Sequence, residues 1–136
     1  MKTLHKVSIL IWLSFAPFLT CAQDTNRTNS FDPNFTHVVY FWLHNPEDPN
    51  ERKQFETALQ KLFNNSLYTK TNFLGSPPRA TREVVDDSFT YAMIVTFESA
   101  GAQQAYQQEK AHLEFIAEAG HLLKNYVVYD AVGIGE

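Results

Sequence analysis

The clearest strand pattern of the chain lies in residues 87–99, which read DSFTYAMIVTFES. Aromatic and β-branched residues dominate positions 89–97, and such residues favour strands. Side chains alternate between the two faces of a strand. One face therefore carries Phe89, Tyr91, Met93, Val95 and Phe97, and the other Thr90, Ala92, Ile94 and Thr96. Because neither face is charged, we expect the strand to be covered on both sides.

The sequence on either side predicts three more strands and two helical regions. The strands are expected at residues 36–44, 67–74 and 126–132. The first helix is expected at about 49–64, where Asp48, Pro49 and Glu51 form an N-capping pattern. The second helical region follows Ser99 and continues in a further piece at about 111–124. The order β-α-β-β-α-β predicts an α+β, ferredoxin-like antiparallel sheet with helices on one face.

The sheet face away from the helices is also apolar. Tyr40 and Trp42 lie on it, together with Ala92 and Ile94 or their neighbours. A bare apolar sheet face is unusual on a soluble monomer. We therefore expect a second copy of the chain to cover it in a two-fold homodimer.

Residues 1–22 have the pattern of a secretory signal peptide. Lys2 and Lys6 supply the positive charge, residues 7–19 are almost wholly apolar, and Ala22 is a small residue at the cleavage site. The apolar run is shorter than the ~20 residues of a membrane-spanning helix. We therefore expect export to the periplasm or out of the cell, with no stable membrane span. Residues 23–34 predict a flexible polar leader, and residues 35–132 the folded domain.

Cys21 is the only cysteine of the chain, so no internal disulfide can form. Lipid anchoring at Cys21 is an alternative to plain cleavage. Phe18 and Thr20, however, make a poor lipidation motif, and cleavage after Ala22 is the preferred interpretation.

Charge and histidine spacing argue against two classes of partner. Without Lys2 and Lys6 the chain keeps nine basic and fifteen acidic residues, and the basic ones form no stripe. Nucleic acid is therefore not an expected partner. His37 and His44 point to opposite sides of one strand. We expect no metal site and no cofactor.

Several sequence segments, in order, resemble the stress-responsive A/B barrel (Dabb) family. The matching segments are His37-Val38-Val39-Tyr40-Phe41, residues 87–99, Ala105-Tyr106, Ala111-His112-Leu113-Glu114-Phe115 and Val127-Val128-Tyr129-Asp130. Together they span about 35–132, nearly the whole predicted domain. The resemblance implies a homodimer whose two sheets close into an α/β barrel, and a pocket between sheet and helices. It also implies a connection with stress responses.

One plant branch of that family, the olivetolic acid cyclases, implies a chemistry for the pocket. These enzymes fold a linear polyketide by aldol condensation without cofactor or metal, using a histidine and a tyrosine near the second helical region. His112 and Tyr106 stand at the matching spacing, and His37 matches a pocket histidine of the first strand. The third strand of that branch carries a further pocket histidine where this chain has Tyr91.

His112 and Tyr106 are the candidate catalytic residues. A histidine can act as a general base near neutral pH, and Tyr106 could hydrogen-bond a substrate oxygen. On an unbroken helix the two side chains would lie about 120° apart. They can share a pocket only if the helix breaks near Glu109 and Lys110. The alternative is that His112 serves the structure of that break.

His37, Tyr91 and Phe89 are the candidate ligand-binding residues. His37 could contact a ligand or be a core histidine that bonds the backbone. Tyr40, Trp42, Tyr91 and Phe89 could form an aromatic cavity, but dimer core is the favoured interpretation of Tyr40 and Trp42.

Two functions remain open from the sequence. The favoured one is a homodimer that binds a small apolar molecule. The alternative is a cofactor-free, polyketide-cyclase-like enzyme, or a cofactor-independent monooxygenase, in which His112 is the general base and Tyr106 its partner.

Overall fold

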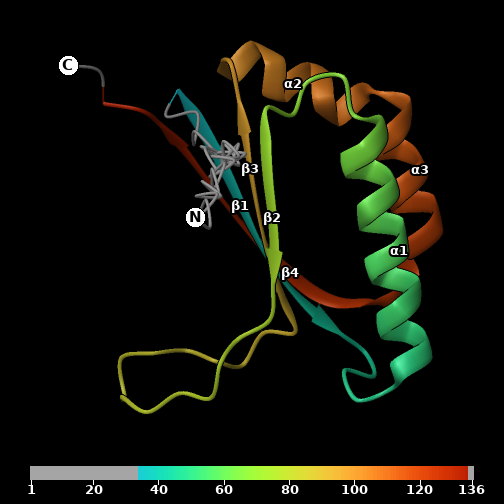
Figure 1. The fold of residues 1–136 in the computed structure, drawn as a ribbon, viewed down its shortest axis with the longest axis vertical. Coiled ribbons are helices and arrows are strands. Elements are labelled where there is room, and N and C mark those ends of the chain that lie inside the picture. Colours follow the sequence, from blue (N-terminus) through green and yellow to red (C-terminus); the bar gives the residue numbers. More distant parts are fainter. Residues whose placement is uncertain (1–33, 135–136) are drawn as a thin grey trace, which may run out of the picture.

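The computed structural model of the protein describes residues 34–134, which form an antiparallel sheet with helices packed on one side (Figure 1). The elements are β1 Phe35–Leu43, α1 Pro49–Asn65, β2 Thr71–Gly75, β3 Tyr91–Phe97, α2 Ala100–Gln108, α3 Lys110–Ala119, a 3-10 turn at Gly120–Leu122 and β4 Leu123–Val132. The predicted ferredoxin-like α+β fold is confirmed. The predicted signal peptide at 1–22 and the predicted leader at 23–34, apart from Asn34, lie outside the described residues.

β1 is the centre of the sheet, whose strand order is β2-β3-β1-β4. Both neighbours of β1 run antiparallel to it, and Val39 lies opposite Met93 on β3 and Val128 on β4. Every second residue of β1 is buried, beginning at Phe35 and including His37. The two faces predicted for this strand are confirmed, and the helices cover the face that carries His37.

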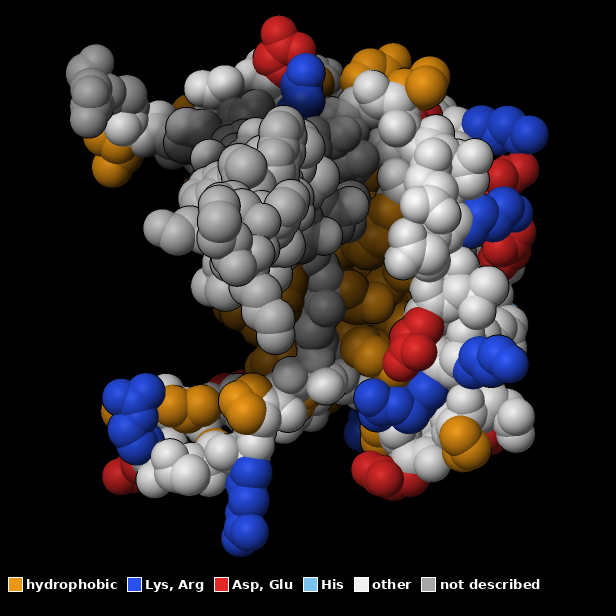
Figure 2. All heavy atoms as spheres, in the orientation of Figure 1, with side chains coloured by type: hydrophobic (Ala, Val, Ile, Leu, Met, Phe, Trp, Pro, Cys, Tyr) orange, Lys and Arg blue, Asp and Glu red, His pale blue; other side chains and the backbone are white. Residues whose placement is uncertain are grey.

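α1 and α3 each bury an apolar stripe, whereas α2 buries Gln103 and Tyr106. In α1, the Asp48 carboxylate accepts a hydrogen bond from the Asn50 backbone N–H, and Pro49 begins the helix. Glu51 does not complete a capping box, because its carboxylate accepts a bond from the Asn45 side chain. The buried residues of α1 are Phe55, Ala58, Leu59 and Leu62. Figure 2 shows charged side chains on the outer side of the helix layer and hydrophobic ones between the helices and the sheet.

Four predicted element boundaries were wrong. β2 begins at Thr71 rather than at residue 67, because the Ser66 hydroxyl accepts bonds from the backbone of Tyr68 and Thr69 and holds them in a turn. The predicted helix at 111–124 ends at Ala119, and β4 begins at Leu123. β3 begins at Tyr91 rather than Phe89, because the chain bends at Thr90.

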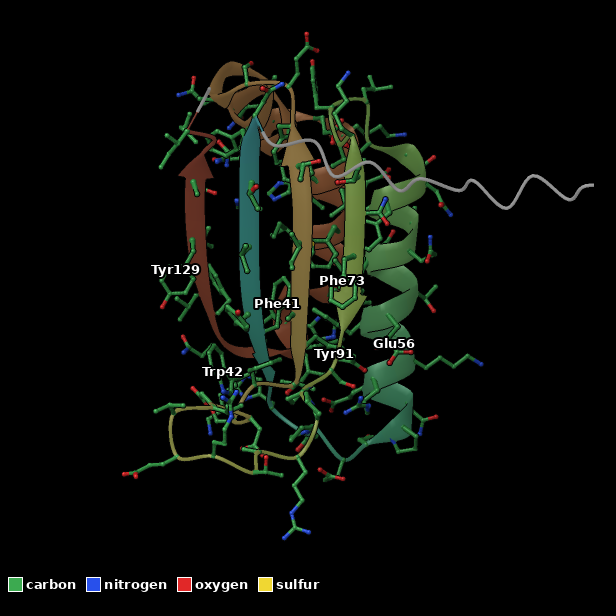
Figure 3. The ribbon with its side chains drawn as sticks, turned by 60° about the vertical axis from the view of Figure 1, so that its left-hand side comes forward. Phe41, Trp42, Glu56, Phe73, Tyr91 and Tyr129 are labelled. Carbon is green, nitrogen blue, oxygen red and sulfur yellow. The ribbon has the colours of Figure 1, made fainter. Side chains whose placement is uncertain are left out.

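Within residues 34–134, the helices cover only one face of the sheet. The other face is turned toward the viewer in Figure 3. The strand registers align one apolar row across this face, made of Phe73, Ile94, Val38 and Tyr129. Phe73 is 55% exposed and Tyr129 is 61% exposed. The predicted apolar second face is therefore present on the single chain. We call it the open face.

Candidate functional site

A pocket of about 270 Å³ lies between the helices and the half of the sheet formed by β1 and β4. The strand registers build its floor, because His37 pairs with Asp130, Val39 with Val128 and Phe41 with Tyr126. The residues that line it are His37, Val39, Phe41, Met93, Gln103, Tyr106, Gln107, His112, Phe115, Ile116, Leu123, Tyr126, Val128 and Asp130. The wall is mainly apolar, and the polar groups are few and come from both layers.

A break between α2 and α3 brings Tyr106 and His112 into this pocket. Glu109 has an extended backbone, with φ −70° and ψ 153°, and ends one helix while it precedes the next. Its backbone N–H donates to the Tyr106 carbonyl, and its carboxylate accepts a bond of 2.9 Å from the Leu67 backbone. The ring centres of Tyr106 and His112 are consequently 4.8 Å apart. The break lies near Glu109 and Lys110, where the sequence reasoning placed it as the condition for Tyr106 and His112 to share a pocket.

His112 is the neutral basic group of this pocket. Burial lowers the pKa of its imidazole below the ordinary 6.5, and the nearby His37 lowers this pKa further. The Gln107 backbone and the Glu109 carboxylate act in the opposite direction with smaller effect overall. Within residues 34–134, Nδ1 of His112 has no hydrogen-bond partner. A neutral imidazole at pH 7 can accept a proton, as a general base must.

Tyr106 keeps its proton and is therefore a donor. Its side chain is almost fully buried, and this burial raises the pKa of the phenol well above 10, with a further increase from the Glu109 carboxylate. Its ring packs on Phe97 at 4.9 Å and lies 6.2 Å from the ring of His37. Tyr106 is thus part of the core and of the pocket wall at once.

His37 is joined to Asp130, a residue to which the sequence reasoning gave no role. The His37 Nδ1 and the Asp130 Oδ1 are 2.5 Å apart, and the carboxylate is the acceptor. His37 is buried, whereas Asp130 is partly exposed at the edge of the sheet. The sequence did contain an indication, because Asp130 is the only charged residue of the otherwise apolar run YVVYDAV at 126–132.

Two glutamines of α2 were also missed by the sequence reasoning. Gln103 and Gln107 are one helical turn apart and both line the pocket. Gln103 is 5% exposed, which is unusual for a glutamine. The only sequence indication was their spacing relative to Tyr106, and this spacing becomes informative only when the face of α2 that meets the sheet is known.

Tyr91 and Phe89, two of the predicted ligand-binding residues, do not line this pocket. Tyr91 is on the helix side, but its hydroxyl donates to the Glu56 carboxylate (Figure 3) and its ring stacks on Phe55 at 5.3 Å. The Arg52 guanidinium lies 4.8 Å from the same ring centre. These contacts point the Tyr91 hydroxyl toward α1 and away from His112.

Phe89 belongs to the open face. The bend at Thr90 ends the alternation on which its predicted face was based, and its ring packs on Tyr40 at 4.8 Å. Tyr40, Trp42 and Phe89 line a separate, shallow hollow of about 510 Å³ there. The aromatic residues considered as one cavity are thus divided between the two faces of the sheet.

Among residues 34–134, no group of three or more His, Cys, Asp or Glu side chains is arranged to hold a metal ion. In the same range, no helix has the length and apolar character needed to cross a membrane.

Comparison with known proteins places the sequence in one family. The family model described as Stress Responsive A/B Barrel Domain matches residues 35–132. This range is the domain predicted from the sequence and covers well over half of the chain. None of the curated proteins compared with the chain matches it.

Solved structures share the fold at low sequence identity. A dimeric ferredoxin-like protein of unknown function from Thermobifida fusca is 19% identical, with 73% of this chain and 90% of that chain covered and a TM-score of 0.60. The hydroxynitrile lyase from Passiflora edulis is 22% identical, with 74% and 94% covered and a TM-score of 0.64. A Dabb family protein with a ferredoxin-like fold from Mesorhizobium loti is 16% identical, with 74% and 97% covered and a TM-score of 0.62. At these identities the likeness concerns the fold alone.

Proposed function

Because the chain belongs to the stress responsive A/B barrel domain family, we propose that it is an exported homodimer that binds a small, largely apolar molecule in the pocket between β1, β4 and the helices. The observation that carries the proposal is the pocket itself. Its wall is apolar, and a few polar groups from α2, α3, β1 and β4 converge on it. This composition is typical of small-molecule sites, and about 270 Å³ suits a small ligand. A role in stress responses rests on the family alone.

The homodimer is supported by the open face. Val38, Ile94, Phe73 and Tyr129 form a continuous apolar row that the described helices leave uncovered. A second copy placed sheet to sheet would remove this row from water. The structurally similar protein from Thermobifida fusca is described as dimeric.

Export is supported by residues 1–22, which combine two lysines, an apolar run and a small residue at the cleavage site. The test is N-terminal sequencing of the protein recovered from its native cells. A mature protein that starts at Gln23 is expected. A mature protein that starts at a lipid-modified Cys21 would favour the anchored alternative, and an intact Met1 would contradict export.

Ligand binding can be tested by closing the pocket at its mouth. Ile116 lines the pocket and is about half exposed, so that a larger side chain there can block the entrance without disturbing the core. Leu113 lies on the same helix with similar exposure but does not line the pocket. Leu113→Trp is therefore the matched control for Ile116→Trp.

The measurement is a thermal-shift screen of small apolar compounds on the wild type and both variants. We expect hits on the wild type that Leu113→Trp keeps and Ile116→Trp loses. The same hits on Ile116→Trp would place binding elsewhere, and a screen without hits on the wild type would contradict the proposal. Repeating the screen on His112→Ala shows whether His112 contacts the compounds, because an unchanged set of hits would remove it from binding.

An enzymatic function is the second candidate, and the pairing of a neutral His112 with a protonated Tyr106 favours it. In this chemistry His112 accepts a proton from the carbon next to a carbonyl group, and Tyr106 donates a hydrogen bond to the carbonyl oxygen as negative charge develops there. The His37–Asp130 pair faces the same space from the sheet. A cyclase that closes a ring by aldol condensation without a cofactor needs such a step.

The catalytic proposal can be tested with a probe that has one exchangeable carbon-bound hydrogen. Ethyl 2-methylacetoacetate in deuterated buffer loses the signal of this hydrogen as it exchanges, which proton NMR records. We expect the wild type to accelerate this exchange above the buffer rate and His112→Gln to abolish the acceleration. Exchange at the buffer rate with the wild type, or unchanged acceleration by His112→Gln, would refute His112 as the base.

A further inference from the structure

Gln103 is a buried amide whose side-chain N–H the described residues leave unpaired. It lies on the inner side of α2, one turn before Tyr106, and it lines the pocket. Among residues 34–134, its Nε2 has no hydrogen-bond partner. A buried donor without a partner destabilises a fold, and most such donors in native proteins are paired. A leucine would fill the same space without this cost, so the amide calls for an explanation beyond packing.

The charges around Gln103 indicate which acceptor suits it. Within residues 34–134, no lysine or arginine lines the pocket, and the one carboxylate that does, Asp130, is paired with His37. A ligand carboxylate or phosphate would therefore enter an apolar space without a free cation and beside a negative charge, which is unfavourable. A neutral oxygen acceptor carries no such cost. Gln107, one turn further along α2, adds a second neutral amide at the same wall.

We propose that Gln103 determines specificity in this pocket by donating its side-chain N–H to the oxygen of a neutral carbonyl group on an otherwise apolar ligand. This inference rests on the proposed ligand-binding function. The last torsion of a glutamine side chain is soft, so the amide can turn its N–H toward the pocket space. Tyr106 and His112 line the same pocket, so a carbonyl oxygen bound by Gln103 would lie in the space that both side chains face.

The test compares probes that differ only at the polar group. Acetophenone and ethylbenzene have nearly the same shape, but only acetophenone has a carbonyl, and benzoate replaces the carbonyl with a charged carboxylate. Their dissociation constants are measured by NMR titration of the full-length mature protein. For the wild type we expect acetophenone to bind about 3- to 10-fold more tightly than ethylbenzene, as one net hydrogen bond allows, and benzoate to bind most weakly.

The variants separate a specificity role from a structural one. In Gln103→Leu the preference for acetophenone over ethylbenzene should fall to about 1, because the apolar wall is kept and the donor is lost. Gln103→Met is a second variant of similar shape, in case leucine disturbs folding. Gln104→Leu is the matched control, because Gln104 is exposed on the same helix, and it should keep the wild-type preference.

Each contrary result has a distinct meaning. Equal binding of acetophenone and ethylbenzene by the wild type, or an unchanged preference in Gln103→Leu and Gln103→Met, overturns the role of Gln103 but leaves the pocket as a ligand site. Tightest binding of benzoate overturns the neutral carbonyl as the ligand group. Failure of all three probes to bind contradicts the proposed function and this inference with it.

Discussion

The imidazole of His37 on β1 and the carboxylate of Asp130 on β4 are joined by a hydrogen bond of 2.5 Å, although 93 residues separate them in the sequence. The antiparallel register places the two residues directly opposite each other on the face that the helices cover. Because a carboxylate only accepts hydrogen bonds, Nδ1 of His37 is the donor. The bond restrains the orientation of the ring, and both residues line the pocket.

A double-mutant cycle on this pair should reveal a coupling of about 1 kcal/mol, typical of a partly buried hydrogen bond. The variants are His37→Gln, Asp130→Asn and their combination, and the measurement is urea unfolding at pH 7. The control cycle uses Lys110 and Glu114, an exposed pair 3.4 Å apart on α3, where a coupling of at most about 0.5 kcal/mol is expected. Equal coupling energies in the two cycles would show that the His37–Asp130 bond stabilises the fold no more than an exposed ion pair does.

The stability of the protein should fall as the pH drops below about 6.5, in part because of His112. The folded state lowers the pKa of this imidazole below 6.5, so the unfolded chain takes up the proton first. Above pH 6.5 both states are neutral at this site, and the loss of stability develops between 6.5 and the lower folded pKa. Urea unfolding of the wild type and His112→Gln between pH 7.5 and 5 tests this. The variant should lose less stability on acidification. If the free energy of unfolding fell equally with pH in both proteins, the lowered pKa of His112 would be contradicted.

A charge on the open face should weaken dimerisation. Tyr129 is 61% exposed in the single chain and lies in the apolar row of that face. Tyr129→Glu would bury a carboxylate between two sheets, and we expect a cost of about 2 kcal/mol or more, or about 30-fold in the dissociation constant. Analytical ultracentrifugation at micromolar concentration measures it. Leu113→Glu, on the helix layer and also exposed, should dimerise like the wild type. A monomeric wild type would refute the dimer itself.

The apolar core between α1 and the sheet should dominate stability. Leu59 on α1 has no exposed surface, and Leu59→Ala is expected to lower the free energy of unfolding by about 2–5 kcal/mol through lost burial and a cavity. Leu67, which follows α1 and is 85% exposed, is the control. Leu67→Ala should change stability by no more than about 0.5 kcal/mol. Both values come from urea unfolding, and a similar loss in the two variants would contradict this view of the core.

Much of this architecture was predictable because it depends on local patterns. The alternation along β1 identified the face of His37, and the capping residues Asp48 and Pro49 located the start of α1. A break near Glu109 was named as the condition for Tyr106 and His112 to share a pocket, and the chain breaks there. Periodicity and capping act over a few residues, so they can be read without knowing the partners of a segment.

The sequence misjudged features that depend on one local irregularity. Phe89 was predicted to share a face with Tyr91 by counting in steps of two, and the bend at Thr90 places it on the opposite face. Tyr91 was predicted to contact a ligand, but Arg52, Phe55 and Glu56 of α1 engage its side chain, and it does not line the pocket.

What the sequence determined by itself is the order of strands and helices, their buried faces and the family to which the chain belongs. Tertiary structure alone decided that Asp130 meets His37, that Gln103 faces the same space as His112, and that the pocket forms on the β1–β4 half of the sheet. The physical reason is that these contacts join segments far apart in the chain. Their existence depends on strand register and on how the helices pack, which no short stretch of sequence specifies.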